Sequence, residues 1–390
     1  MVQKKRLLFP VICLLLLAAC KEKYDSPIQT PITGYLVVDG IVNSGTGPAS
    51  ITLSRTTQFS NKKMVYEKNA QVTLQGSDSS VKNFTEKANG VYSATDLNLN
   101  PALQYRLRII TVNGARYMSD FVVVKNNPPI DSISWTYKPE GLQSYIHTHD
   151  PLNKSVYYQW YYEETWQIVS TYYPTLKYQT KVVPGLGQQF SVVYKDSSTY
   201  GPDPSIVNCW QFHNPLDIYL ASTAKLSRDE INLPLAFIPR SDIKLGVLYS
   251  INLRQYTWTK EGYEFMERMK KNTESTGSVF DPQPSELKGN IHNTADAAEP
   301  VIGFFNISPV REKRIFIKPS EVPGWGYNPG CLDVEIENIS DSISKKALGM
   351  LPVDPVKVAP FGAIVSFRAT SPECADCTLR GTNVKPSYWP

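Results

Sequence analysis

The sequence predicts an all-β, mainly antiparallel protein, with an N-terminal immunoglobulin-like β-sandwich followed by a larger β-rich domain with one prominent helix. The chain of 390 residues contains 23 tyrosines and 29 prolines, and Thr and Val recur throughout, a composition that favours strands and turns. Over many short segments, apolar residues alternate with polar ones, which is typical of strands with one buried face. Only one segment has clear helical periodicity.

The N-terminal segment has the features of a lipoprotein signal. Three basic residues at 4–6 precede an apolar run at 7–17 that is too short to span a bilayer as a helix. The run ends in Leu-Ala-Ala before Cys20. We therefore expect residues 1–19 to be a cleaved signal peptide and Cys20 to be acylated, which anchors the chain in membrane lipid. Residues 20–33 would then form the anchor and tether.

The residues after Cys20 indicate the outer membrane. Lys21, and not Asp, follows the cysteine, which resembles the sorting rule for outer-membrane lipoproteins of Gram-negative bacteria. The pair Lys21-Glu22 also resembles the surface-export signal of Bacteroidetes lipoproteins. The predicted location is the periplasmic or cell-surface face of the outer membrane, with the surface favoured. No later stretch approaches the ~18 apolar residues of a spanning helix.

The charge balance gives no sign of a nucleic-acid partner. The formal net charge is +4, from 40 basic and 36 acidic residues. Removal of the three basic residues of the signal leaves 37 basic residues and a net charge of +1. Nucleic-acid binding needs a strong basic excess, which this chain does not have.

The first domain is predicted at residues 34–126. Its expected strands are Tyr35–Val42, Ala49–Arg55, Ala70–Gln75, Val91–Tyr92, Gln104–Val112 and Arg116–Val124. The pair Asn113-Gly114 is typical of a type I′ hairpin turn. Short strands at this spacing, without a helix, predict the immunoglobulin-like sandwich. The sequence Asn-Asn-Pro-Pro at 126–129 marks the boundary, because successive prolines cannot continue a strand ladder.

The second domain is predicted at residues 127–390. Its expected strands are Asp131–Lys138, Ser155–Glu164, Ile243–Trp258, Val301–Ile307 and Ile315–Lys318. The strand at 243–258 has the most regular alternation in the chain, so one of its faces should be buried. The helix is expected near 259–272, where Thr259 can cap it and apolar residues recur at helical spacing. We expect this helix to pack on a sheet.

The cysteines predict structural disulfides. Of six cysteines, one is lost with the signal and one is acylated, which leaves Cys209, Cys331, Cys374 and Cys377. An even number in an oxidising compartment favours disulfides over a redox or zinc role for the C-x-x-C sequence, and three connectivities are open. Cys374 and Cys377 should bond either to each other or, one of them, to Cys209 or Cys331. We favour Cys374–Cys377 with Cys209–Cys331, because C-x-x-C pairs form readily when both side chains face one way.

Histidines and catalytic motifs give little sign of chemistry. His147 and His149 would share a face of a strand, as metal ligands can, but no motif supplies further ligands, and His213 and His292 are isolated. We therefore expect no metal site and no cofactor. The chain contains neither G-x-S-x-G nor H-E-x-x-H. Glu163 and Glu164 would face opposite ways on a strand, so they do not form a glycosidase pair.

One strand face carries aromatic side chains that have two possible roles, and the ligand-binding residues remain unknown from the sequence. Arg254, Tyr256 and Trp258 fall on the face opposite Leu253. Aromatic side chains on such a face either stack on sugars or peptides or cover a neighbouring sheet. The second role is the commoner one, and we expect it here.

Several short motifs, in their order along the chain, resemble the DUF4249 family of Bacteroidetes outer-membrane lipoproteins. They are Tyr35–Gly40, Gly90–Tyr92, Tyr105–Ile110 with Asn113-Gly114, Gly277–Pro282, Gly289–Ile291, Gly303–Ser308, Cys374–Cys377 and Pro386–Trp389. The resemblance implies an accessory lipoprotein that accompanies a TonB-dependent outer-membrane transporter, as a surface-bound lid or capture protein. It implies no catalytic residues, and it names no ligand.

The expected function is therefore that of a non-enzymatic accessory ligand-capture or lid subunit of a TonB-dependent uptake system. The alternative is a structural or adhesive cell-envelope lipoprotein without a small-molecule ligand. A transporter gene next to the gene of this protein would favour uptake.

Overall fold

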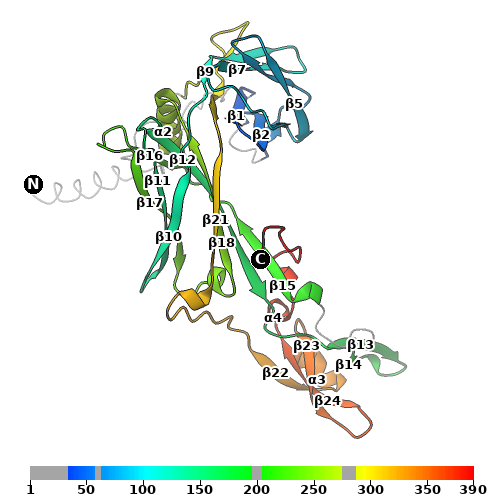
Figure 1. The fold of residues 1–390 in the computed structure, drawn as a ribbon. Helices are drawn as coiled ribbons and strands as arrows, with labels where there is room; N and C mark the ends of the chain where they lie inside the picture. The colour runs from blue at the N-terminus through cyan, green and yellow to red at the C-terminus, as the bar shows by residue number, and fades with distance from the viewer. Residues whose placement is uncertain (1–33, 58–62, 196–203, 275–286) are drawn as a thin grey trace, which may run out of the picture.

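The computed structural model describes residues 34–57, 63–195, 204–274 and 287–390. These residues form an all-β, mostly antiparallel protein, as predicted. Figure 1 shows a β-sandwich at one end, a second pair of sheets in the middle and a small β module at the other end. The predicted signal peptide, Cys20, the tether and the motif at 277–282 lie outside the described residues. No described helix is long and apolar enough to cross a membrane.

The first sandwich is built from strands of the N-terminal region. They are β1 (Leu36–Asn43), β2 (Pro48–Arg55), β3 (Val65–Tyr66), β4 (Gln71–Gly76), β5 (Val81–Ala88), β6 (Val91–Thr95), β7 (Gln104–Ile110), β8 (Arg116–Ser119) and β9 (Val122–Val123). Strand β5 pairs with both β4 and β6, so one continuous ladder folds into two layers. The apolar residues of each alternating strand, such as Leu53 and Leu107, meet in a single core between the layers.

Two strands from much later in the chain complete this sandwich. Strand β19 (Ile291–Asn293) pairs antiparallel with β8, and β20 (Ile302–Ser308) pairs parallel with β1. Gly303 permits the close approach, because a Cβ atom there would lie 2.1 Å from the carbonyl oxygen of Val38. The strand pairing therefore extends the first unit beyond the predicted residues 34–126.

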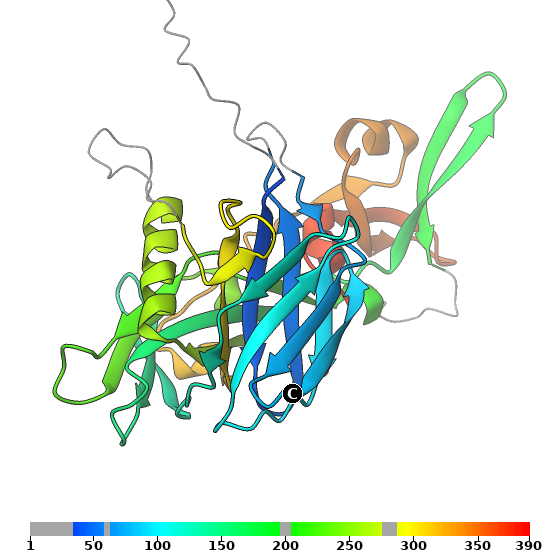
Figure 2. The same cartoon turned by 90° about the horizontal axis from the view of Figure 1, so that it is seen from above.

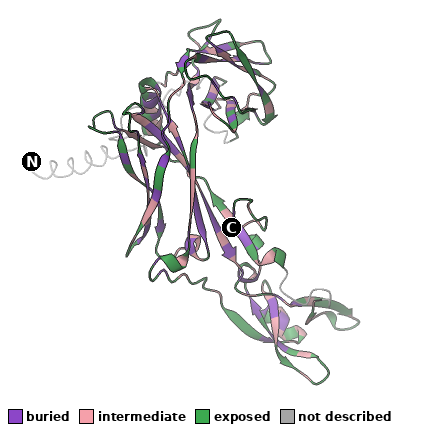
Figure 3. Ribbon diagram, in the orientation of Figure 1, coloured by how far each residue is buried: buried purple, intermediate pink, exposed green. Residues whose placement is uncertain are grey.

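Two sheets form the second unit. One contains β10 (Ile130–Lys138), β11 (Gly141–His149) and β17 (Glu230–Pro239); the other contains β12 (Tyr157–Val169), β15 (Asn208–His213), β16 (Tyr219–Ser222), β18 (Tyr249–Thr257) and β21 (Arg311–Ile317). Their facing side chains form one core, in which Tyr158 and Trp160 are fully buried. The aromatic segment predicted as a strand is thus the central strand of this core. Figure 3 shows the burial along these long strands.

The predicted strand at 243–258 begins later than expected. Residues 243–245 form a 3-10 turn, η3 (Ile243–Leu245), and the strand starts at Tyr249. Asp242 causes the difference, because its side chain caps the turn by accepting a hydrogen bond from the amide of Lys244. The predicted helix is confirmed as α2 (Lys260–Glu274), with Thr259 Oγ1 accepting from the amide of Gly262 at 3.2 Å. Figure 2 shows α2 beside the first sandwich.

A small distal module has no counterpart among the predicted elements. It combines the hairpin β13 (Leu176–Val183) and β14 (Gly187–Tyr194) with β22 (Asp333–Glu337), α3 (Ser340–Lys346), β23 (Leu351–Val358) and β24 (Ile364–Thr370). Seven buried residues, including Leu176, Ile343 and Phe367, form its core. Three short 3-10 turns, η2 (Pro204–Ile206), η4 (Pro319–Glu321) and η5 (Cys377–Leu379), and the helical turn α4 (Pro372–Ala375) lie in the connections.

The four remaining cysteines form disulfides, but the favoured pairing was wrong. The bonds are Cys209–Cys377 and Cys331–Cys374, and not Cys374–Cys377 with Cys209–Cys331. Cys374 belongs to α4, whereas Cys377 begins the next turn, η5, so the two side chains meet different partners. Cys377 lies next to β15, where Gly381 and Thr382 approach Trp210. Both bonds therefore tie the C-terminal segment to distant parts of the chain.

Candidate ligand-binding cleft

The strongest candidate site is a cleft between the first sandwich and the second unit. It has a polar half of about 370 Å³ and an apolar half of about 330 Å³. Asp39 and Ile41 of β1 and Tyr161 of β12 line both halves, so the halves meet at these side chains. Cavities of this size between structural units are common ligand sites.

Strand alternation places the side chains of the cleft. In β18, Ile251 and Leu253 point into the core of the second unit, so Arg254 and Tyr256 point the opposite way, toward the first sandwich. Arg254 is the cross-strand partner of Tyr161 on β12. In β1, Val38 lies in the core of the first sandwich, and Asp39 therefore faces outward into the cleft.

The polar half contains a carboxylate without a partner. Asp39 makes no side-chain hydrogen bond or ion pair with any described residue, and burial raises the pKa of its carboxyl group. The side chain is exposed to solvent through the cleft, and the protein around it displaces part of the surrounding water. Its charge is therefore only partly hydrated and has no described partner.

Two tyrosines stand beside this carboxylate. The rings of Tyr161 and Tyr256 pack edge to face, with centroids 5.7 Å apart. Gln159 donates a hydrogen bond of 2.7 Å to the hydroxyl of Tyr161. Burial raises the pKa of both phenols, and the charge of Asp39 raises them further. Both hydroxyls therefore stay protonated across the physiological range and can donate hydrogen bonds to a ligand.

The apolar half is formed around helix α2. Its apolar lining includes Leu216, Ile218, Trp258, Phe265, Met266, Met269 and Phe304. Trp258 is buried, donates a hydrogen bond of 2.8 Å from Nε1 to Gln159, and packs edge to face on Phe304. Gly262 lets the helix approach, because a Cβ atom there would lie 2.6 Å from the ring of Trp258. Leu216, at 97% exposure, stands at the edge of this half.

Comparison with known proteins identifies the family. Residues 21–314 match the family model described as "Domain of unknown function (DUF4249)". The chain belongs to the DUF4249 family. No curated protein sequence matches it. Among solved structures, the chicken interferon gamma receptor alpha chain matches at 9% identity, over 58% of this chain and 90% of that chain, with a TM-score of only 0.15.

The three residues that the sequence placed on one face, Arg254, Tyr256 and Trp258, have two different surroundings in this DUF4249 protein. Trp258 covers a neighbouring element, as expected, and it also lines the apolar half of the cleft. Arg254 and Tyr256 line the polar half. Asp39 was missed, because a polar residue at an outward position of a strand is unremarkable in sequence. Only the parallel pairing of β1 with β20 and the position of β12 show that Asp39 faces a cavity.

The histidines do not assemble a metal site in the described part of the chain. His147 and His149 share a strand face, as expected, but His147 pairs with Ser134 at 2.7 Å and His149 with Asp131 at 2.7 Å. The hydrogen bond that His149 donates to the Asp131 carboxylate raises the pKa of His149. An open depression of about 570 Å³ lies beside them. No three His, Cys, Asp or Glu side chains come together as ligands among the described residues.

The adjacent glutamates of β12 point apart, as predicted for a strand. Glu163 pairs with Arg314 at 3.1 Å. Glu164 is buried, and its partners are Lys244, Tyr249 and His213. The isolated His213 of the sequence therefore belongs to this cluster, and His292 lies 3.6 Å from Asp120 on the surface.

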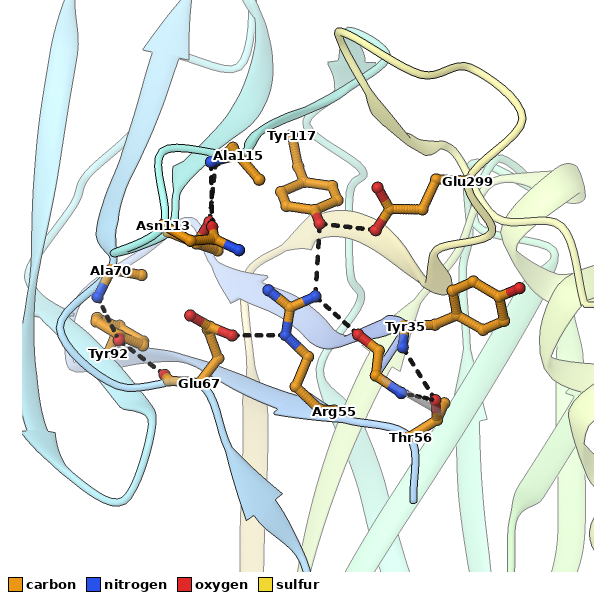
Figure 4. A network of polar contacts seen from close by, with 12 residues as sticks. Tyr35, Arg55, Thr56, Glu67, Ala70, Tyr92, Asn113, Ala115, Tyr117 and Glu299 are labelled. Carbon is orange, nitrogen blue, oxygen red and sulfur yellow. Dashed lines mark hydrogen bonds and ion pairs between the residues drawn. The ribbon is translucent and has the colours of Figure 1, made fainter. Parts of the chain in front are cut away.

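A polar network fixes the start of β1, the strand that carries Asp39 (Figure 4). Arg55 Nε bonds Glu67 at 2.5 Å, and Arg55 Nη1 donates to the carbonyl oxygen of Gly34 at 2.9 Å. The hydroxyl of Tyr117 lies 3.5 Å from Arg55 Nη1 and donates to Glu299 at 2.8 Å. Glu299 precedes β20, so the network connects both strands of the parallel pair.

Proposed function

We propose that this DUF4249 protein is a non-enzymatic lipoprotein of the Bacteroidetes type, anchored in the outer membrane through Cys20. It captures a small ligand in the cleft and acts as an accessory or lid subunit of a TonB-dependent uptake system. The observation that carries the proposal is the unpartnered Asp39 carboxylate between Tyr161 and the apolar half of the cleft. No cofactor is needed for this role.

The side chain of Asp39 is open to solvent through the cleft, but the protein atoms around it displace part of its hydration and no described group replaces that water. Side chains that serve only the fold are paired, as Glu164 is. A cleft residue that stays unpaired is better explained by a ligand that supplies the partner. Convergent polar groups beside an apolar wall are typical of small-molecule sites.

The position of the anchor agrees with capture near a membrane. The tether would lead directly into β1, which lines the cleft. Residues 20–33, fully extended, would reach about 50 Å, enough to hold the cleft close to a transporter in the same membrane. Acylation at Cys20 would provide the stable attachment.

Co-purification tests the proposal. The native lipoprotein would be extracted from outer membranes in mild detergent through a C-terminal tag, and bound proteins identified by mass spectrometry. A TonB-dependent transporter should co-purify. The Cys20→Ser variant should be released into the soluble fraction or retain its signal peptide. A wild-type protein that stays anchored but brings no transporter would contradict the uptake role.

One observation favours the alternative, a structural or adhesive envelope protein. The hairpin tips of the distal module expose apolar side chains, with Val182 at 74%, Leu186 at 70% and Phe361 fully exposed. Such tips suit contacts with another surface. Replacement of these three residues by serine should leave transporter co-purification intact if uptake is the main role, and should abolish surface adhesion if the alternative holds.

A further inference from the structure

The two halves of the cleft differ in what they can bind. The apolar half is bounded by helix α2 and β20. The indole N–H of Trp258 there is already bonded to Gln159, so Asp39 and Tyr161 are the polar side chains that this half offers a ligand. A saccharide carries hydroxyl groups on all sides, and those placed in the apolar half would lose their hydrogen bonds to water. The tyrosine rings of Tyr161 and Tyr256 are also perpendicular, at 84°, and do not form a flat platform for a sugar. The apolar half therefore favours a hydrocarbon or aromatic group.

The charges of the cleft are separated in a definite order. Asp39 lies where the apolar and polar halves meet, whereas Arg254 lines only the polar half. Arg254 forms no ion pair with a described residue, and it does not compensate Asp39, whose pKa is raised by burial alone. Both charges act on the phenols of Tyr161 and Tyr256 between them.

A matching ligand has an apolar group next to a cationic group, with an anionic group further along. This is the order of groups in a short peptide with an apolar first residue. The side chain of that residue is next to the α-ammonium, and the terminal carboxylate follows after the peptide bonds. The peptide N–H and C=O groups could pair with Tyr161 and Tyr256 hydroxyls in the polar half.

We propose that the cleft binds short peptides with a free amino terminus and an apolar first residue. The ammonium meets Asp39, the first side chain enters the apolar half, and the carboxylate meets Arg254. The inference rests on the proposed capture function and adds the ligand class to it. Charge-assisted hydrogen bonds at both ends would fix the direction of the peptide.

Calorimetric titration of the full-length mature lipoprotein in detergent tests the inference. The probes are Phe-Ala-Ala, its N-acetylated form, its C-terminal amide, and maltotriose as a saccharide of similar size. Phe-Ala-Ala should bind. Loss of one charge-assisted contact should weaken binding about tenfold to a hundredfold for the acetylated peptide and by a smaller factor for the amide. Maltotriose should not bind.

Two variants identify the contacts. Asp39→Asn should weaken Phe-Ala-Ala about as much as N-acetylation does, and it should not further weaken the acetylated peptide. Arg254→Gln should remove the difference between the free carboxylate and the amide. Asp78→Asn, in an exposed turn of the first sandwich, and Arg116→Gln, exposed on β8, are matched controls that should bind like the wild type.

The outcomes separate the ligand class from the capture function. Equal binding of the free and acetylated peptides, or binding of maltotriose in preference to both, would overturn the peptide class while a ligand site remains. Binding of Phe-Ala-Ala that is unaffected by Asp39→Asn would place the peptide elsewhere and also overturn the inference. If no probe binds and no transporter co-purifies, the capture function itself fails.

Discussion

Two carboxylates in neighbouring parts of the molecule have opposite surroundings. Glu164 is 2% exposed and is bonded to Lys244 Nζ at 2.7 Å, Tyr249 Oη at 2.8 Å and His213 Nδ1 at 2.7 Å. Asp39 is exposed to the cleft and has no described partner, and displacement of water by the protein around it raises the pKa of its carboxyl group. In the first pattern, the protein itself supplies every partner of the carboxylate. The second leaves a cost in the folded protein that a ligand can remove, and this contrast separates structural polar residues from binding residues.

The largest loss of stability is expected from removal of the Cys209–Cys377 disulfide, which lies beside the Glu164 cluster. Cys209 belongs to β15, which also carries His213. The bond to Cys377 spans 168 residues, so the double substitution Cys209→Ser with Cys377→Ser should lower the free energy of unfolding by about 4 kcal/mol. Chemical denaturation measures the loss. Affinity for a cleft ligand at low denaturant should stay unchanged, since neither cysteine lines the cleft.

The other disulfide is the control for this loss. Cys331 and Cys374 are separated by only 43 residues, so their double substitution should cost less. If the two double variants were equally stable, loop closure would not explain the stabilisation.

The next largest effect should come from Glu164 itself. Glu164→Gln keeps the shape but leaves Lys244 without its anionic partner and weakens the bond from Tyr249. Removal of one member of a buried ion pair should cost about 3 kcal/mol. Glu163→Gln, on the more exposed opposite face, should cost less than about 1 kcal/mol. Equal losses in urea denaturation would show that the buried cluster has no special role.

A smaller effect is expected from the network in Figure 4. Arg55→Ala removes the bonds to Glu67 and to the carbonyl oxygen of Gly34, and should lower stability by about 2 kcal/mol. Arg116→Ala, exposed in the same sandwich, should stay within about 0.5 kcal/mol of the wild type. Thermal unfolding of the two variants gives the comparison. If Arg55→Ala lost as little stability as Arg116→Ala does, the network would not contribute to the stability of the fold.

Local patterns predicted much of the fold. Thr259 and the apolar spacing after it were sufficient for α2, and alternation placed Arg254 and Tyr256 opposite Leu253. The start of β18 was missed because the alternation continues through Leu245, while the side chain of Asp242 caps a 3-10 turn there. The capped turn at Asp242 therefore determines the local structure there, although the apolar alternation predicts a strand.

Long-range pairings could not be predicted from the sequence. The return of β20 to β1 depends on a close backbone approach at Gly303, which no periodicity marks. The disulfide connectivity depends on where α4 and η5 direct Cys374 and Cys377. Asp39 becomes a site residue only through such distant neighbours. The sequence placed Arg254 and Tyr256 on one strand face but expected them to cover a sheet, and it did not point to Asp39.

The smallest expected effect is also of opposite sign, and it tests the Asp39 side of the contrast directly. Burial raises the pKa of Asp39 above its ordinary value of 3.8, so the folded state disfavours the charged carboxylate more than the unfolded state does. Ionisation of Asp39 therefore lowers the free energy of unfolding as the pH rises from the unfolded pKa through the folded pKa of this group. The pKa values of the neighbouring Tyr161 and Tyr256 are raised, so both phenols stay protonated in this range.

Asp39→Asn should accordingly raise the melting temperature at pH 7, and the gain should shrink steadily as the pH falls toward 3.5, below the unfolded pKa of 3.8, where the wild-type side chain is mostly protonated in both states. Asp78→Asn is the matched control in the same sandwich. Hydrogen bonds from Ser80 lower the pKa of Asp78, so its replacement should reduce stability at pH 7. Melting curves from pH 3.5 to 8 decide between the two signs. A loss of stability in Asp39→Asn at neutral pH would mean that Asp39 is a paired, structural carboxylate like Glu164, and the case for a ligand at this position would fall with it.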